Sequence, residues 1–315
     1  MLALCLAALI AADDPRPAAP YKSVAELKIA HDRTLVADLE GYLKANPKAN
    51  DRDLGYMAIF DVAIEHDWFA DVEALARGYL DDNKDGAVRP LARIVATMAR
   101  AQAGRFDQAL AGFKELMAGL DRPDQQEFAA NFADNLANAA LTAGENGVAR
   151  QVYETLLDRY GEAPELRRKI KDDLGRLDRL GRPAPTAIAK DIDGKAFRLS
   201  DLRGKYVLVD FWATWCAPCL GELPNIRANF DKYHAKGFEV VGVSLDETAE
   251  PLVEFVKARK LPWAQVHNAT CGADLVELFG VNNIPATFLV GPDGTILRLE
   301  LRGPALGRAL EQYLK

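Results

Sequence analysis

Two cysteines three residues apart carry the clearest chemical signal in this sequence. The segment reads Trp215-Cys216-Ala217-Pro218-Cys219 and follows an apolar run that predicts a buried strand. A helix is expected to begin here, where free backbone N–H groups and the helix dipole favour a thiolate over a thiol. Only the thiolate attacks a disulfide, and the second sulfur lies within reach of the first. We therefore expect Cys216 to attack and Cys219 to resolve the mixed disulfide.

Two alternative roles for the same pair stay open. A structural zinc site needs two more ligands, and Cys271 with His267 is the only nearby candidate pair. A purely structural disulfide is the second alternative. The four cysteines of the chain, Cys5, Cys216, Cys219 and Cys271, build no disulfide framework. We expect Cys271 to be a buried, inert thiol, with a second redox role as its alternative.

Three further positions have side chains that suit the same chemistry. Asp210 is an acid inside an apolar strand, where desolvation should raise its pKa; a solvated acid at a strand end is the alternative. Glu222 follows Cys219 by three positions and so lies on the same helix face; a surface acid is the alternative. Ile284-Pro285 precedes a buried strand, where a proline requires a special turn.

The second half of the chain alternates between strand and helix patterns. Apolar runs at 206–212 and 238–244 predict strands buried on both faces, with a helix over 218–234 between them. The remaining expected elements are a hairpin around Asp193-Gly194, helices over 251–260 and 273–279, a hairpin over 285–301 and a helix over 305–314. This order predicts an α/β domain with a mixed central sheet covered on both faces.

These motifs resemble those of a known family. Residues 209–219 are similar to the active-site segment of thioredoxin-fold oxidoreductases. Features that resemble the TlpA/ResA-like branch are the spacing Cys216-x-x-Cys219-x-x-Glu222-x-Pro224, the Asp193-Gly194 hairpin and Ile284-Pro285. The resemblance covers residues 184–315. It implies a thioredoxin-like thiol-disulfide exchange domain, which in this family is usually extracytoplasmic.

The resemblance also implies catalytic roles. Cys216 and Cys219 would cycle between a disulfide and a dithiol. Asp210 matches the acid that lies behind the second cysteine in thioredoxins and accepts its proton. Glu222 would relay protons or tune the thiolates.

Substrate contacts follow from the same resemblance. The Ile284–Pro285 peptide bond is expected to be cis, with its backbone facing Cys216 and pairing with an extended substrate segment. Trp215 and Pro218 complete the set of residues that we expect to contact substrate.

The first half of the chain is predicted to be all-helical. Apolar residues recur at helical spacing from Ser23 to about Leu180. Residues 103–116 match residues 143–156 at an offset of 40, with Gly, Ala, an aromatic residue and Leu in register. This period indicates helix-turn-helix units that resemble tetratricopeptide-type repeats, with a degenerate copy at 68–80. An unrelated Ala-rich bundle is the alternative.

Proline-rich segments suggest the domain boundaries. Residues 1–12 are apolar and uncharged, which is typical of a signal peptide, although no Lys or Arg precedes the apolar run; a plain amphipathic or frayed N-terminus is the alternative. Residues 13–20 are expected to be a linker. Gly181 to Pro185 ends the helical pattern, so we expect a helical domain over 21–181 and a redox domain over 184–315, each folding by itself.

Composition limits the partners. The 315 residues include 39 Lys+Arg and 46 Asp+Glu, for a net charge of −7 with no long basic run, so nucleic acid is not an expected partner. We interpret the chain as an exported, periplasmic or secreted thiol-disulfide oxidoreductase that acts on protein thiols or disulfides. An external redox partner would reset it, and no metal or organic cofactor is expected. Cys-Ala-Pro-Cys together with Ile284 favours the reducing direction.

Two alternative functions stay open at this point. A peroxiredoxin-type peroxidase shares the fold but needs Thr-x-x-Cys, whereas this chain has Thr214-Trp215-Cys216, one residue too short. In the second alternative the helical repeats are an interaction scaffold for a protein partner, and the redox site is accessory.

Overall fold

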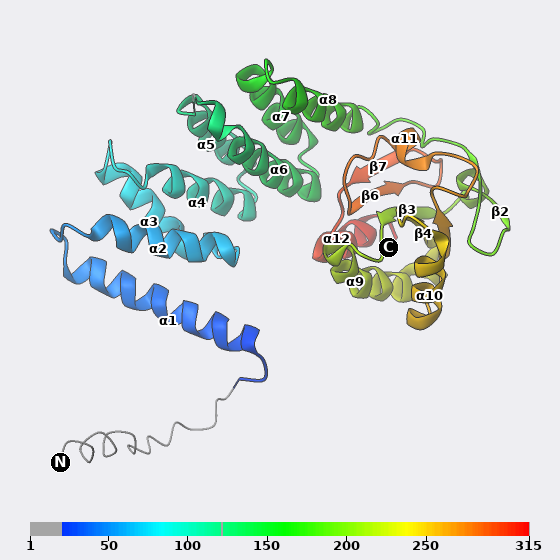
Figure 1. Ribbon diagram of the computed structural model, residues 1–315, viewed down its shortest axis with the longest axis horizontal. Coiled ribbons are helices and arrows are strands. Elements are labelled where there is room, and N and C mark those ends of the chain that lie inside the picture. The colour runs from blue at the N-terminus through cyan, green and yellow to red at the C-terminus, as the bar shows by residue number, and fades with distance from the viewer. Residues whose placement is uncertain (1–20, 121, 315) are drawn as a thin grey trace, which may run out of the picture. The chain divides into compact units, whose positions relative to one another are not determined.

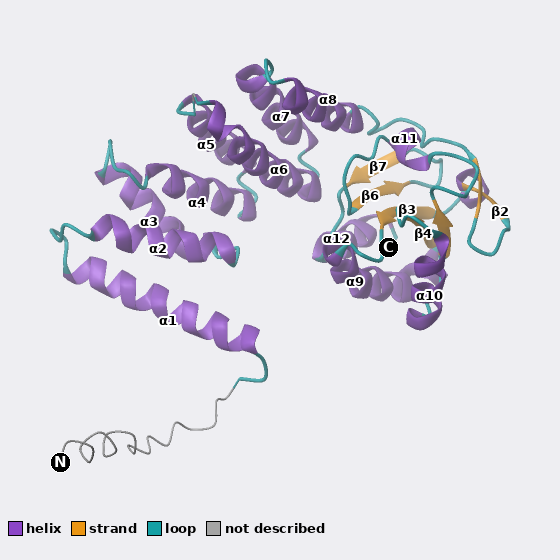
Figure 2. Cartoon of the chain, in the orientation of Figure 1, coloured by secondary structure: helices purple, strands orange, loops and turns teal. Residues whose placement is uncertain are grey.

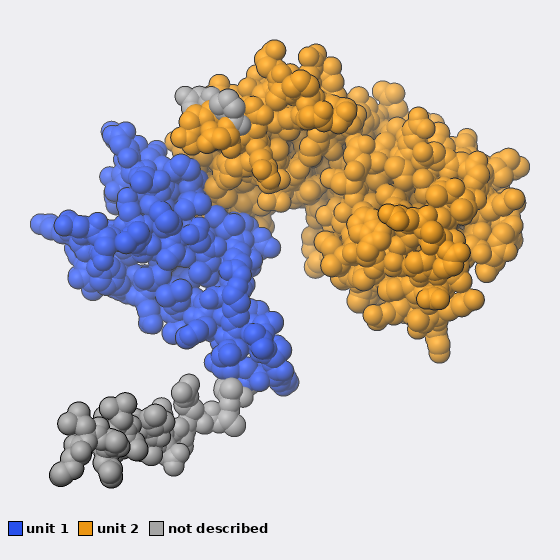
Figure 3. Space-filling view, viewed as in Figure 1, with its two compact units in different colours: residues 1–92 blue, residues 93–315 orange. Residues whose placement is uncertain are grey.

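The computed structural model describes residues 21–120 and 122–314. Its contacts divide the chain into two compact units, residues 1–92 and 93–315 (Figure 3). The expected boundary between helical and redox regions, at 181–184, lies inside the second unit and stays a prediction. The expected signal peptide and linker, residues 1–12 and 13–20, lie outside the described residues.

The region before the redox domain is all-helical, as predicted (Figures 1 and 2). Its helices are α1 (Val24–Ala45), α2 (Arg52–Glu65), α3 (Phe69–Asp82), α4 (Arg89–Gln102), α5 (Phe106–Ala118), α6 (Gln126–Ala143), α7 (Asn146–Tyr160) and α8 (Pro164–Leu177), with a short 3-10 turn at Pro123–Gln125. Among the described helices of the chain, none is long and apolar enough to cross a membrane.

The internal period corresponds to two similar turns between helices. Gly104 precedes α5 and Gly144 precedes α7, and both have left-handed φ angles of 72° and 91° that glycine adopts without steric cost. The matching small residues Ala109 and Ala149 are fully buried in these helices. The assignment to tetratricopeptide-type repeats stays a prediction.

The redox domain contains a five-stranded mixed sheet, which confirms the predicted fold class. Its strands are β3 (Tyr206–Trp212), β4 (Phe238–Ser244), β5 (Ala264–His267), β6 (Ala286–Val290) and β7 (Ile296–Leu299), in the order β5-β4-β3-β6-β7. Strands β3, β4 and β5 are parallel, whereas β6 and β7 run antiparallel to their neighbours. The expected first hairpin is a separate pair, β1 (Ile188–Lys190) and β2 (Ala196–Arg198).

The sequence pattern missed strand β5. Its four residues, Ala-Gln-Val-His, lack the continuous apolar character of β3 and β4. Polar partners in the interior compensate for this, since the indole N–H of Trp212 donates to Gln265 at 3.1 Å. This bond satisfies the side-chain oxygen of Gln265, whereas its buried Nε2 has no hydrogen-bond partner among the described residues.

Helices cover both faces of the sheet. Helices α9 (Ala217–Tyr233), α10 (Ala249–Arg259) and α12 (Pro304–Tyr313) share one buried cluster with Leu208 and Trp212 of β3. On the opposite face, Phe211 packs against Phe279 of α11 (Leu275–Phe279) and against Phe288 of β6. Alternate β3 residues therefore face different layers, and Asp210 lies on the face that α9 covers.

The second unit also joins helix α6 to strand β7. The Thr142 hydroxyl donates to the backbone carbonyl of Glu300 at 3.0 Å, and Arg298 donates to the Thr142 carbonyl at 3.0 Å. The neighbouring Gly144 approaches Arg298 so closely that an added Cβ would lie 3.1 Å from the guanidinium. The turn before α7 is thus constrained both by its backbone conformation and by strand β7.

We predict that Gly144→Ala lowers the free energy of unfolding by roughly 1–2 kcal/mol, because alanine resists a left-handed φ and would press on Arg298. Gly147→Ala is the matched control: Gly147 lies in the first turn of α7 with nothing within 4 Å of an added Cβ. That control should be neutral or stabilising by up to about 1 kcal/mol. Urea denaturation measures both, and equal effects of the two substitutions would contradict the prediction.

Candidate active site

The cysteine pair occupies the junction between β3 and α9. Cys216 is the N-cap of α9, and its sulfur accepts a hydrogen bond from the backbone N–H of Cys219 at 3.2 Å. The two residues form a disulfide with their Cα atoms 5.2 Å apart. Pro218 lies in the first turn, where its missing N–H removes no helical hydrogen bond.

The two cysteines differ little in exposure. Cys216 is 5% exposed and Cys219 is 3% exposed, whereas the neighbouring Trp215 is 66% exposed. Exposure therefore does not distinguish the attacking sulfur from the resolving one in the disulfide form. What separates the two sulfurs is position, because Cys216 caps the helix and Cys219 lies inside its first turn.

Asp210 is buried beneath α9, so it is not a solvated acid at a strand end. It is 4% exposed and pairs in register with Gly242 of β4 and Thr287 of β6. Burial raises the pKa of its carboxyl to about 7, the charge of Glu222 adds to this increase, and the positive charge of Arg302 opposes it. The site thus contains a carboxyl group that titrates near neutral pH.

Glu222 is half-buried, which argues against a plain surface acid. Its carboxylate accepts hydrogen bonds from the backbone N–H of Gly303 at 2.8 Å and from the amide of Asn225 at 3.2 Å. These contacts hold the carboxylate between α9 and the start of α12. Its charge also raises the pKa of Asp210, so the two acids, which were predicted separately, interact electrostatically.

The loop before β6 forms another side of the site. The Ile284–Pro285 peptide bond is cis, as the family resemblance implies. Ile284 packs against the apolar cluster that includes Cys216 and Cys219. The carbonyl of Pro285 accepts a hydrogen bond from the guanidinium of Arg302 at 2.5 Å.

A polar network supports the segment before Cys216, and the sequence pattern did not predict it. The carboxylate of Asp246 accepts hydrogen bonds from the backbone N–H and the hydroxyl of Thr214, and from the Ser244 hydroxyl at 2.6 Å. The ring of His267 donates to the Asp246 carbonyl at 2.7 Å. Ser244 and His267 end strands β4 and β5. Polar residues at neighbouring strand ends were the available signal.

The two candidate zinc ligands outside the cysteine pair are engaged elsewhere. The second ring nitrogen of His267 faces the Thr270 hydroxyl at 2.9 Å, and the buried thiol of Cys271 donates to the Ala273 carbonyl at 2.9 Å. Within residues 21–120 and 122–314, the single group spaced for a metal is Asp32, Glu65 and His66 in the first unit. The surroundings of Cys271 agree with a buried thiol.

Known proteins share this domain. Residues 180–298 match the AhpC/TSA family. The thiol-disulfide oxidoreductase ResA of Bacillus thuringiensis subsp. konkukian is 35% identical over 136 residues, which are 43% of this chain and 77% of that protein. The chain belongs to the ResA family of thiol-disulfide oxidoreductases. Another member, ResA of Bacillus subtilis, is 31% identical over 119 residues, 38% of this chain and 65% of that protein.

Solved structures of similar sequence cover the same region. The thioredoxin domain of a thiol-disulfide oxidoreductase from Bacteroides vulgatus is 33% identical, with a TM-score of 0.40, and the match covers 43% of this chain and 98% of that one. The helical region α1–α8 lies before this ResA-family domain.

The raised pKa of Asp210 predicts a pH-dependent stability. In the unfolded chain its carboxyl titrates near an ordinary value of about 3.9, so the folded chain holds an extra proton between about pH 4 and pH 7. Stability that is present below pH 4 is lost as the pH rises through this window. Asp210→Asn cannot ionise, so its stability relative to the parent should rise by roughly 2–3 kcal/mol from about pH 5 to about pH 8.

Urea denaturation of both proteins at these two pH values measures this rise. Asp231→Asn, at an exposed acid on α9, is the control and should change little between them. The stability difference between Asp210→Asn and the parent could instead be the same at both pH values. Asp210 would then have the same pKa in the folded and unfolded chains, which contradicts the prediction.

Proposed function

We propose that this chain exchanges electrons between the Cys216/Cys219 pair and protein thiols or disulfides. The observation that carries the proposal is the disulfide at the N-terminus of α9, directly after the central strand of a ResA-family domain. The reaction requires an external thiol or disulfide partner to reset the pair.

The proposed reducing reaction has two steps. The Cys216 thiolate attacks a substrate disulfide, forms a new S–S bond with one substrate sulfur and releases the other as a thiolate. Cys219 then loses its proton and attacks the sulfur of Cys216, which closes the Cys216–Cys219 disulfide and releases the second substrate sulfur. The substrate gains the two electrons that the cysteine pair loses, and the reverse sequence oxidises a dithiol.

Asp210 is proposed as the proton acceptor for Cys219. It lies on the sheet face that α9 covers, and its pKa of about 7 suits a group that takes up and returns a proton near neutral pH. Glu222 is proposed to tune this transfer, because its charge raises the pKa of Asp210 and its carboxylate is held by Gly303.

Substrate is proposed to bind around the exposed side of the disulfide. Trp215 is largely exposed beside Cys216, and Pro218 lies in the first turn of α9. Ile284 packs against the cysteine cluster, which supports a role for its backbone and that of Pro285 in pairing with an extended segment. This arrangement suits a polypeptide substrate.

Direction and location are part of the proposal. The Cys-Ala-Pro-Cys segment with Ile284 favours reduction of substrate disulfides. The apolar residues 1–12 and the resemblance to a usually extracytoplasmic family support an exported, periplasmic or secreted protein. The peroxidase alternative gains no support from the site, because the paired cysteines form an internal disulfide and the ResA relatives are named thiol-disulfide oxidoreductases.

Trapping experiments test the order of attack. Cys219→Ser should accumulate a mixed disulfide with a protein disulfide, because the first step survives and the displacing thiol is gone. Cys216→Ser should trap almost nothing near neutral pH. A thiol of pKa about 7 is then roughly half ionised, against a few per cent for one of about 8.5.

Non-reducing gels and mass spectrometry identify the trapped species. Cys271→Ser is the control and should behave like the parent, because this thiol is buried and apart from the pair. If Cys216→Ser traps substrate as efficiently as Cys219→Ser, the assigned roles are wrong.

A further inference from the structure

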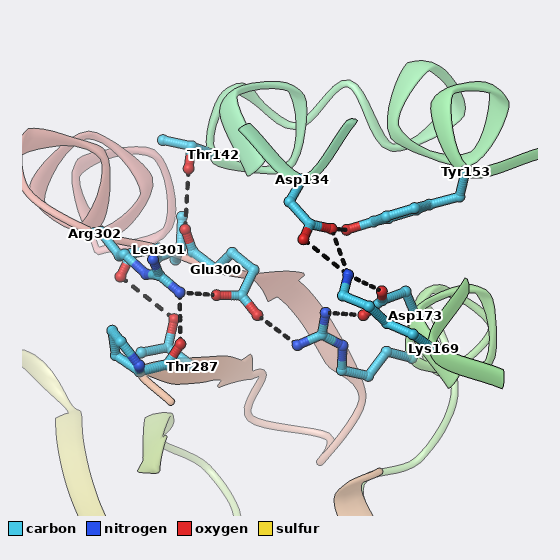
Figure 4. Close-up of polar contacts among 11 residues, drawn as sticks. Asp134, Thr142, Tyr153, Lys169, Asp173, Thr287, Glu300, Leu301 and Arg302 are labelled. Atoms are coloured by element: carbon cyan, nitrogen blue, oxygen red, sulfur yellow. Dashed lines mark hydrogen bonds and ion pairs between the residues drawn. The ribbon is translucent and has the colours of Figure 1, made fainter. Parts of the chain in front are cut away.

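A series of ion pairs, here called the ion-pair chain, runs within the second unit from helix α8 to the loop that contains the cis Ile284–Pro285 bond (Figure 4). We call this loop the cis-proline loop. Arg176 of α8 bridges Asp173, at 2.7 Å, and Glu300, at 3.0 Å. The other carboxylate oxygen of Glu300 accepts from Arg302 at 2.7 Å. The same Arg302 nitrogen donates to the carbonyl of Pro285 at 2.5 Å.

Further polar contacts among α6, α7 and α8 fix the end of the ion-pair chain that lies in the helical region. Lys169 of α8 contacts Asp134 of α6 at 2.8 Å and Asp173 at 3.1 Å. The hydroxyl of Tyr153 in α7 faces Asp134 at 3.4 Å, and burial holds the pKa of that hydroxyl far above its ordinary value. Helices α6, α7 and α8 therefore all contribute to the position of Arg176.

The central residues of the ion-pair chain have buried, charged side chains. Asp173 is 3% exposed, Arg176 7% and Glu300 3%. Desolvating such ions is costly, and their mutual attraction offsets that cost only when the geometry is good and every partner is present. An apolar contact would hold α8 against the segment after β7 without this penalty. The charged pairs therefore indicate that the positions of these side chains matter.

Glu300 provides an independent sign of a specific requirement. It has a φ of 54°, a left-handed conformation that glycine adopts readily and glutamate rarely. Strained backbone of this kind persists where surrounding contacts hold it, and it is enriched near functional sites. At this position the side chain links Arg176 to Arg302, which glycine could not do.

The end of the ion-pair chain opposite to α8 lies at the cis-proline loop, where Arg302 contacts Pro285. A polar cavity of about 120 Å³ opens between the two regions, lined by Asn138 and Tyr153 on the helical side and by Asn283, Ile284 and Pro285 on the other. Arg302 lines it as well. The cis-proline loop and the helical region thus line the same cavity, and the ion pairs run along its wall through Asp173, Arg176, Glu300 and Arg302.

We propose that Arg176, Glu300 and Arg302 are positioning residues through which helices α6–α8 hold the cis-proline loop in the conformation that receives a polypeptide substrate. The inference rests on the proposed function, since it assigns the helical region a part in the same exchange reaction. It deepens that function by making the helical region a determinant of which disulfides react.

The proposal distinguishes two kinds of substrate. A polypeptide disulfide depends on the cis-proline loop for alignment, whereas a small aromatic disulfide needs only access to the Cys216 sulfur. Loosening the ion-pair chain should therefore slow the first reaction and spare the second. A purely structural role would affect both alike, because it would act through the whole redox domain.

The experiment compares the pre-reduced full chain with Glu300→Gln and Arg176→Met in stopped-flow reactions. Insulin is the polypeptide disulfide and Ellman's reagent is the small one. We expect each substitution to lower the rate constant with insulin by roughly tenfold or more. The rate constant with Ellman's reagent should stay within about twofold of the parent.

Arg150→Gln is the matched control, because Arg150 is a helical-region arginine whose ion pair is with the exposed Asp178 and not with a member of the ion-pair chain. It should leave both rates unchanged. Glu300→Gln keeps the size of the side chain, so it decides the question if Arg176→Met fails to fold. Arg176→Lys, which keeps the charge, should recover part of the insulin rate.

Two outcomes would overturn the inference, provided that the parent reacts with both probes. In the first, Glu300→Gln leaves the rate constant with insulin unchanged. In the second, it lowers the rate constants with insulin and with Ellman's reagent equally. Failure of the proposed function looks different, because the unaltered chain would then fail to reduce insulin, even though its free thiols still react with Ellman's reagent. That result would remove the inference together with the function on which it rests.

Discussion

The first turn of α9 has backbone N–H groups that need acceptors, and the sulfur of Cys216 accepts one of them from Cys219. A helix N-terminus stabilises negative charge on the atom that caps it, and in the dithiol form that atom is the Cys216 sulfur. Other parts of the domain fix the position of Cys216. The central strand β3 ends at Trp212, shortly before Cys216. Asp246 accepts hydrogen bonds from Thr214, two residues before Cys216.

Carboxyl groups gathered behind the cap form the second requirement of the site. Asp210 and Glu222 would repel each other if both were ionised, and Arg302 is the cation that acts on Asp210. Burial raises the pKa of Asp210 to about 7, so this group holds or releases its proton near neutral pH. The same arginine binds the carbonyl of Pro285, which couples the charge of the site to the loop proposed to bind substrate.

Local sequence patterns predicted the parts of the fold that depend on near neighbours. Strands β3 and β4 begin and end where their apolar runs do, and the Cys216/Cys219 spacing indicated a helix N-terminus. Strand β5 was missed because two of its three buried residues, Gln265 and His267, are polar, and their partners, such as Trp212, lie far away in the sequence. Contacts between distant residues were beyond the reach of such patterns. Arg176 and Glu300 are 124 residues apart, and nothing near either residue indicates that they pair. Burial of Asp210 was predictable from its apolar strand, whereas its grouping with Glu222 and Arg302 required the packing of α9 and α12.

A redox titration of the full chain tests the central claim most directly. The protein is equilibrated in thiol buffers of known potential, free thiols are alkylated, and the labelled cysteines are identified by mass spectrometry. The account predicts one two-electron transition in which Cys216 and Cys219 become labelled together, while the labelling of Cys271 does not follow it. A chain that shows no transition, or one in which Cys271 replaces either member of the pair, would contradict it.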